Sequence, residues 1–235
     1  MVIDKVMLNV SDGTVMHAYA ARPDGDGPRP AIIVFQEAFG VNRHIRKLVE
    51  SFTRQGFVAI APELFHRSAP PGFEGSYTDF PAIMPHLQAL TTAGMEADIQ
   101  AAWEWVELQP GVRKGSVVCI GYCLGGRVAW IANSLLPFKA AISYYGGRIA
   151  PELLLRAPAL HGPMLFFWGG LDQHIPPEQI AAVVESMRQA GKPFVNVVFS
   201  DANHGFFCDE RLSFNRAACK ESWALTLAFL REKLA

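Results

Sequence analysis

The apolar and polar positions of this chain fall into two patterns, one typical of strands and the other typical of helices. Strand patterns recur at 4–10, 14–21, 31–35, 58–61, 117–120, 140–144, 164–168 and 194–199. Helix patterns occupy most of the intervals, at 43–55, 93–108, 177–190 and 214–233, and also follow residue 126. Because buried strands that alternate with helices form a mostly parallel sheet covered on both faces, we expect an α/β fold with a central sheet of about eight strands.

Two segments depart from the alternation of buried strands and helices. The first two strand patterns flank Ser11-Asp12-Gly13, which predicts an antiparallel hairpin. Residues 68–90 are rich in Pro, Gly and aromatic residues without a regular period, so we expect a lid or substrate-facing insertion there. His66 and His86 lie in or beside this segment and are expected at the surface. A chain of this length commonly forms one domain, so we assign 1–235 to a single domain.

The turn after the fifth strand has the spacing Gly121-x-Cys123-x-Gly125. Glycines two positions before and after the cysteine remove Cβ atoms that would collide where the strand doubles back into a helix. This spacing is that of the nucleophile elbow, with cysteine in place of serine. The helix N-terminus favours a thiolate, and the backbone N–H of Leu124 would face an oxyanion. The alternative is a buried apolar cysteine in a glycine-rich turn.

Four residues with chemically useful side chains come directly after predicted strands: Glu37, Cys123, Asp172 and His204. Since parallel strands end at the same edge of a sheet, we expect these side chains at one edge. The order nucleophile, acid, histidine is that of α/β-hydrolases. A turn aspartate and a loop histidine are the alternatives for Asp172 and His204 taken singly. The competing bases are His161 and His174.

Composition limits the partners of the protein to small molecules. Half of the residues are apolar, 18% are charged and the net charge is −1, so neither disorder nor a nucleic-acid or membrane surface is indicated. There is no bilayer-spanning apolar run, and Met1–Lys5 lacks the pattern of a signal peptide. The four cysteines form no CxxC pair, which is typical of a reducing compartment. We expect a cytoplasmic monomer or weak homodimer.

These motifs together resemble the dienelactone hydrolase (carboxymethylenebutenolidase) family of α/β-hydrolases over nearly the whole chain. The matching stretches are 36–42 (QEAFGVN), 62–67 (PELFHR), 121–126 (GYCLGG), 144–146 (YYG) and the loops of Asp172 and His204. The resemblance implies that Cys123 is the nucleophile, His204 its base and Asp172 the acid that orients the base. It also implies that Glu37 contacts the resting thiol and helps it ionise. A solvated loop carboxylate is the alternative for Glu37.

The resemblance further implies an oxyanion hole formed by the backbone N–H groups of Leu124 and Ala38. The substrate-binding candidates are Phe39, Tyr144, Tyr145 and Arg211. Of the two tyrosines, we expect one to line the pocket and the other to place its ring in the core. No metal and no organic cofactor is implied.

The sequence departs from the family at the substrate carboxylate. In well-known members, one arginine before the elbow and another four residues after the histidine bind that carboxylate. Here the second position is Cys208, and residues 68–111 contain no Arg or Lys. A thiol cannot replace a bidentate guanidinium. Arg211 and Arg148 are alternative anchors, and a more neutral ester or lactone fits equally well.

We therefore predict a hydrolase that opens a lactone or activated ester through an acyl-thioenzyme on Cys123. A thiolate leaves more readily than an amine, so peptides are not expected as substrates. One alternative is a general carboxylesterase or thioesterase acting on neutral esters. The other is a non-catalytic redox sensor with a hydrolase fold, in which Cys123 is oxidised.

Overall fold

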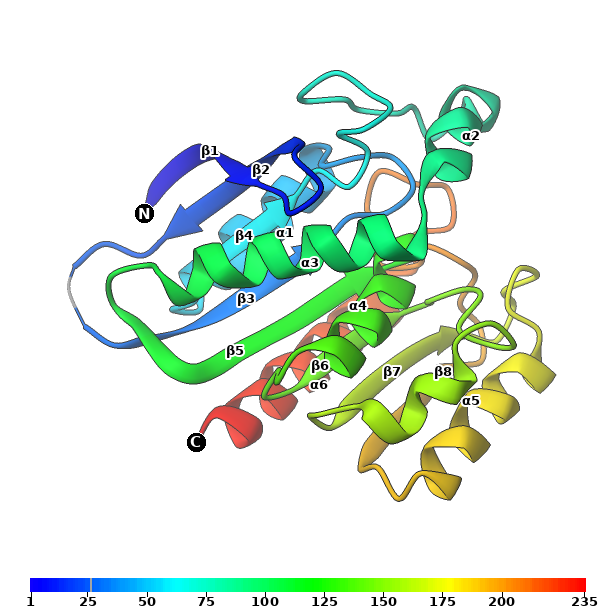
Figure 1. Cartoon of the computed structure of the whole chain (residues 1–235). Helices are drawn as coiled ribbons and strands as arrows, with labels where there is room; N and C mark the ends of the chain where they lie inside the picture. Colours follow the sequence, from blue (N-terminus) through cyan, green and yellow to red (C-terminus); the bar gives the residue numbers. More distant parts are fainter. Residues whose placement is uncertain (26) are drawn as a thin grey trace. The chain divides into compact units, whose positions relative to one another are not determined.

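The computed structural model describes residues 1–25 and 27–235, which divide into two compact units, Met1–Val118 and Cys119–Ala235. The first unit contains the strands β1 (Val2–Asn9), β2 (Val15–Arg22), β3 (Arg29–Phe35) and β4 (Val58–Pro62), in the spatial order β1-β2-β4-β3. The pairs β1–β2 and β2–β4 are antiparallel, whereas β3–β4 is parallel. The predicted hairpin is therefore confirmed, and it forms the blue edge of this sheet in Figure 1.

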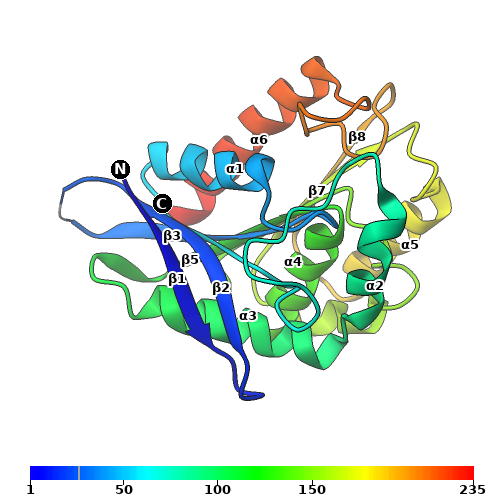
Figure 2. The same cartoon turned by 90° about the horizontal axis from the view of Figure 1, so that it is seen from above.

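Two helices cover opposite faces of this first sheet, α1 (Arg43–Arg54) and α3 (Thr92–Glu107), as Figure 2 shows. α1 begins at Asn42, whose side chain accepts a hydrogen bond from the backbone N–H of Ile45 at 3.2 Å. Such an N-cap satisfies one of the backbone donors that a helix leaves without a partner in its first turn. The strand β3, apolar throughout from Ala31, is consequently buried on both faces.

A third helix of the first unit, α2 (Phe80–Ala89), lies in the segment without a regular period, where no helix was predicted, and the expectation of a lid or substrate-facing insertion stays a prediction. Asp79 caps the helix by accepting from the backbone N–H of Ala82, and Pro81 occupies the first turn, where proline is tolerated. Pro85 lies inside the helix. This proline and the mostly exposed surface of the helix explain why the sequence showed no helical period.

A buried carboxylate ties three segments of the first unit together. Asp98 on α3 is fully buried, and it accepts hydrogen bonds from the Arg67 guanidinium at 2.8 and 2.9 Å. A further hydrogen bond of 3.0 Å joins Asp98 to His66 Nε2. Arg67 also donates to Asp12 in the hairpin turn at 2.7 Å. The side chain of His66 is only 4% exposed, so the prediction of a surface histidine is wrong for this residue.

The second unit is built on the parallel strands β6 (Ala141–Tyr144), β7 (Met164–Gly169) and β8 (Phe194–Phe199), which follow the end of β5 (Val112–Tyr122) in the order β5-β6-β7-β8. α4 (Leu124–Leu135) and α5 (Pro177–Gln189) lie on one face, and α6 (Arg216–Leu234) lies on the other (Figure 2). A short 3-10 helix at Leu154–Ala159 had no counterpart in the sequence pattern.

The strands and helices confirm the expected mostly parallel α/β architecture, with boundaries within a few residues of those predicted. The single-domain assignment of 1–235 stays a prediction. Across residues 1–25 and 27–235, no helix combines the length and the apolar character needed to cross a bilayer.

Candidate active site

Cys123 lies at the apex of a sharp turn between β5 and α4, as the elbow spacing predicts. Its φ is 54° and its ψ is −115°, a conformation that side chains with a Cβ rarely adopt. The turn is held by backbone hydrogen bonds of 3.0 Å from Cys123 N to the Tyr144 carbonyl and from Gly126 N to the Cys123 carbonyl. Cys123 occupies the N-cap position of α4, so its thiol lies at the N-terminus of the helix.

The glycines of the elbow are required because helix and strand approach each other through their backbones. A Cβ on Gly121 would lie 1.8 Å from the carbonyl oxygen of Gly125, far inside van der Waals contact. A Cβ on Gly126 would lie 2.7 Å from the Cα of Gly146 and 2.8 Å from Ser143 Oγ. Of the two glycines in the predicted spacing, Gly121 is thus a steric requirement of this turn, and Gly126 is a further one that the spacing did not include.

Asp172 and His204 are brought together by the parallel pair β7–β8, because each residue lies in the loop that follows one of these strands. His204 Nδ1 lies 2.7 Å from Asp172 Oδ2, and both residues are buried, at 9% and 6% exposure. The other carboxylate oxygen, Oδ1, accepts from the backbone N–H of His174 at 2.8 Å. Asp172 is therefore both a turn residue and the partner of the histidine.

The imidazole of His204 also interacts with Cys123, which is the third member of the predicted set. Burial lowers the pKa of His204, but negative charge on Cys123 and hydrogen bonds with Asp172 and Cys123 outweigh that effect and raise the pKa to about 10. Since Nδ1 is engaged by Asp172, Nε2 is the ring nitrogen left for the sulfur. The second unit thus contains a connected cysteine, histidine and aspartate.

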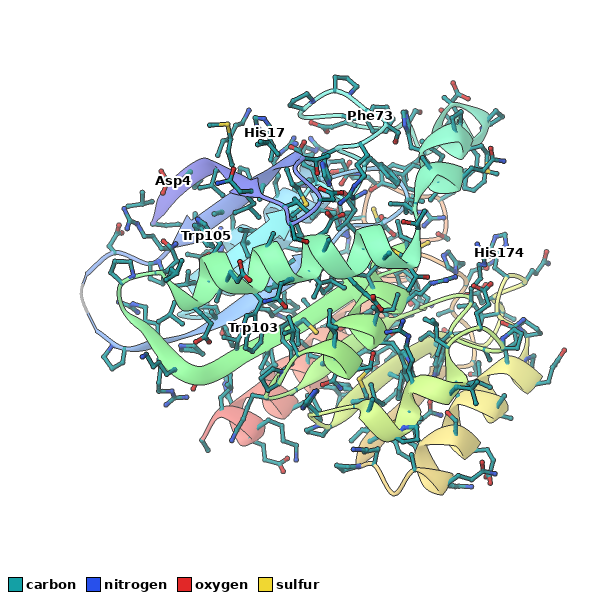
Figure 3. All side chains as sticks on the ribbon, in the orientation of Figure 1. Asp4, His17, Phe73, Trp103, Trp105 and His174 are labelled. Carbon is teal, nitrogen blue, oxygen red and sulfur yellow. The ribbon has the colours of Figure 1, made fainter. Side chains whose placement is uncertain are left out.

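Two rings lie beside this histidine. The rings of Tyr145 and His204 are 5.1 Å apart, and the ring of His174 lies 5.3 Å from that of His204. His174, labelled in Figure 3, is exposed on the loop after β7, whereas Tyr145 is fully buried. Tyr144 is also fully buried, and its hydroxyl lies 2.7 Å from Thr226 Oγ1 on α6. Tyr144 is thus a core residue, and Tyr145 is the tyrosine beside the imidazole.

The two alternative arginines have different surroundings. The guanidinium of Arg211 packs on the residue that follows His204, so that a Cβ on Gly205 would lie 2.3 Å from Arg211 Nη1. Arg148 is exposed and pairs with Glu152 at 2.7 Å. Of these two, Arg211 is the cation in contact with the histidine loop.

Glu37, Ala38 and Phe39 belong to the first unit, where they form the turn directly after β3. Glu37 is fully buried, so the alternative of a solvated loop carboxylate is wrong. Its Oε2 accepts a hydrogen bond of 3.2 Å from the hydroxyl of Tyr77. Sequence reasoning missed Tyr77, because an aromatic residue in an aperiodic segment carries no signal of its partner. The roles of Leu124 and Ala38 in the oxyanion hole, and of Phe39 and Arg211 in substrate binding, stay predictions.

Comparisons with known proteins identify the family of this chain. The profile of the dienelactone hydrolase family matches residues 16–234. A protein of Escherichia coli O157:H7 named "Putative carboxymethylenebutenolidase" is 33% identical over 234 residues, covering 94% of this chain and 84% of the relative. A Synechocystis protein of the same name is 35% identical over 217 residues, covering 87% of each chain.

Solved structures also resemble this chain over nearly its whole length. The crystal structure titled as a putative dienelactone hydrolase from Klebsiella pneumoniae has a TM-score of 0.87 and 31% identity, covering 98% of this chain and 99% of that one. An acylaminoacyl peptidase from Pyrococcus horikoshii shares the fold alone, with a TM-score of 0.75 and 16% identity, covering 99% of this chain and 41% of that one.

The fold and the neighbours define an α/β-hydrolase, which confirms the fold class expected from the sequence. The protein is a hydrolase, and the chain belongs to the dienelactone hydrolase family.

Proposed function

We propose that the protein hydrolyses a lactone or an activated ester through a triad of Cys123, His204 and Asp172. The observation that carries the proposal is the connected set of side chains in the second unit. Asp172 Oδ2 lies 2.7 Å from Nδ1 of the imidazole, and Cys123, in a strained elbow, interacts with the same imidazole and raises its pKa. A thiol needs an adjacent base to become a nucleophile, and the base needs an orienting acid.

The reaction would proceed in two steps. His204 takes the thiol proton, and the Cys123 sulfur attacks the substrate carbonyl to form a tetrahedral oxyanion. The backbone N–H of Leu124, at the N-terminus of α4, stabilises that oxyanion. The oxyanion collapses as the ester oxygen leaves with the proton from His204, which forms a thioester. Water, deprotonated by His204, then attacks the thioester and releases the acid and the thiol. For a lactone, both products remain in one molecule.

Glu37 and the N–H of Ala38 enter this proposal through the family resemblance. In that role Glu37 helps the thiol ionise, and Ala38 supplies the second donor to the oxyanion. The burial of Glu37 supports a specific role, because carboxylates are seldom fully buried without a partner or a function.

The relatives named carboxymethylenebutenolidase suggest a dienelactone as the substrate. One observation favours neutral esters as a second candidate. Cys208 stands where well-known family members have an arginine for the substrate carboxylate, and a thiol carries no positive charge with which to bind it. If a carboxylate is bound, Arg211 is the anchor that we propose, because it already lies on the loop of His204.

The experiment is hydrolysis of cis- and trans-dienelactone and of p-nitrophenyl acetate by the wild-type protein and by Cys123→Ala. Cys219→Ala, which removes another partly exposed thiol of the same unit, is the matched control. We expect activity in the wild type and the control, none in Cys123→Ala, and a trapped acetyl group on the peptide that contains Cys123.

Each pattern of results has a definite meaning. Turnover of the dienelactones supports the family substrate, and an Arg211→Met variant with a raised KM would identify the anchor. Turnover of the acetate alone supports a general esterase. Activity retained by Cys123→Ala would contradict the triad, and silence on all three substrates would favour the sensor.

A further inference from the structure

The buried carboxylate of Glu37 is one end of a short chain of hydrogen bonds within the first unit. The amide nitrogen of Asn42 lies 2.8 Å from the hydroxyl of Tyr77, and that hydroxyl lies 3.2 Å from Glu37 Oε2. Asn42 is 4% exposed and Glu37 is fully buried. Tyr77 comes from the segment between β4 and α2, about forty residues further along the chain.

The direction of these hydrogen bonds is determined by the helix that Asn42 caps. The side-chain oxygen of Asn42 accepts from the backbone N–H of Ile45, so the amide nitrogen must be the group facing Tyr77. An amide nitrogen only donates, so the Tyr77 oxygen is the acceptor in that bond. The hydroxyl proton of Tyr77 is then free to point at Glu37, where it stabilises the charged carboxylate.

The ring of Tyr77 is fixed separately from its hydroxyl. It packs on Phe39 with ring centroids 4.5 Å apart, in a small apolar cluster with Ala38 and Ile83. The backbone N–H of Gly75 donates to the Phe39 carbonyl at 3.0 Å. Phe73, labelled in Figure 3, belongs to the same segment and packs against this cluster. A phenylalanine at position 77 would keep the ring contacts, so the hydroxyl serves the carboxylate rather than the packing.

We propose that Tyr77 is a positioning residue, which holds the Glu37 carboxylate in one orientation for the reaction. The inference rests on the proposed function, in which Glu37 assists the ionisation of the thiol. It assigns a role in catalysis to the segment that precedes α2, because this segment supplies a donor to the carboxylate. A buried carboxylate that lost this donor would be left less well stabilised in its charged form.

The test compares Tyr77→Phe with a matched control, Tyr19→Phe. Tyr19 also belongs to the first unit, and its hydroxyl donates to Glu50 Oε1 at 2.9 Å, so the control removes the same kind of bond from another carboxylate. The measurements are kcat and KM for p-nitrophenyl acetate, and the rate at which iodoacetamide alkylates Cys123 as a function of pH. Glu37→Gln and the double variant Tyr77→Phe/Glu37→Gln complete the set.

We expect Tyr77→Phe to lower kcat roughly 10-fold to 100-fold, the usual value of a hydrogen bond to a charged group, with KM nearly unchanged. The pH profile of alkylation should shift in the same direction as in Glu37→Gln. The double variant should lose no more than Glu37→Gln alone, because Tyr77 acts through that carboxylate. Tyr19→Phe should stay within about twofold of the wild type.

Several outcomes would overturn the inference. The inference is wrong if Tyr77→Phe keeps the wild-type kcat and an unshifted alkylation profile. It is also wrong if Tyr77→Phe lowers kcat as much in the Glu37→Gln background as in the wild type, or if it changes KM alone. These results leave the triad intact as long as Cys123→Ala is inactive. If Cys123→Ala retains activity, the proposed function fails first and the inference fails with it.

Discussion

The steric requirement at Gly121 gives a sharp prediction for the substitution Gly121→Ala. The added Cβ would lie 1.8 Å from the Gly125 carbonyl oxygen, 2.1 Å from the Gly125 carbonyl carbon and 2.8 Å from the Gly126 nitrogen. All three are backbone atoms at the start of α4, so no side-chain rotation can relieve the overlap. The helix start and the end of β5 must separate, and Cys123 lies between them.

The size of the effect follows from this overlap. Ordinary contact between such atoms needs roughly 1.5 Å more separation. Overpacking costs about 1–3 kcal/mol, and we expect the upper end because backbone lies on both sides. For a chain of this length, about 3 kcal/mol corresponds to a fall in melting temperature of roughly 6–12 °C. A displacement of about 1 Å at the nucleophile lowers the rate on the order of 100-fold.

The assay measures the melting temperature together with the hydrolysis of p-nitrophenyl acetate. Gly147→Ala is the matched control in the same unit, because its added Cβ would meet only Ile175 carbons at 3.8 and 3.9 Å. The control should melt within about 2 °C of the wild type and keep its activity. A Gly121→Ala protein that matched the wild type in both measurements would refute the steric reasoning for the elbow.

Three further predictions follow from the buried polar groups. Asp172→Asn should lower kcat on the order of 10⁴-fold, since it leaves His204 without its orienting charge, and kinetics with an unaltered kcat would contradict the triad. Because the pKa of His204 is raised to about 10 in the folded state, its stabilisation should be complete below about pH 6.5 and lost as the pH rises through about 10. Urea unfolding should therefore show the wild type losing stability relative to His204→Gln as the pH rises across that range, and parallel curves would exclude the linkage. Asp98→Asn should lower the free energy of unfolding by about 3–5 kcal/mol, because Arg67 and His66 lose a fully buried partner, and a loss below about 1 kcal/mol would show that the network is dispensable.

Local patterns in the sequence determined the elements and the elbow. Continuous apolar runs such as 31–35 and 164–168 indicated strands buried on both faces, because parallel strands have no solvent-facing side. The spacing of Gly121 and Gly125 around Cys123 indicated the sharp turn, and at Gly121 a Cβ would overlap the backbone of Gly125. These features depend on a few neighbouring residues, which is why the sequence alone could predict them.

Tertiary structure decided which distant polar groups meet. Sequence order placed Asp172 and His204 after their strands, but the pairing at 2.7 Å depends on how the β7 and β8 loops fold. The partners of Glu37 and Asp98 had no signal at all, because Tyr77 and His66 lie in stretches without a regular period. Burial makes an unsatisfied carboxylate costly, so the folded chain supplies donors from whichever segment packs nearest, and that segment is set by the path of the whole chain.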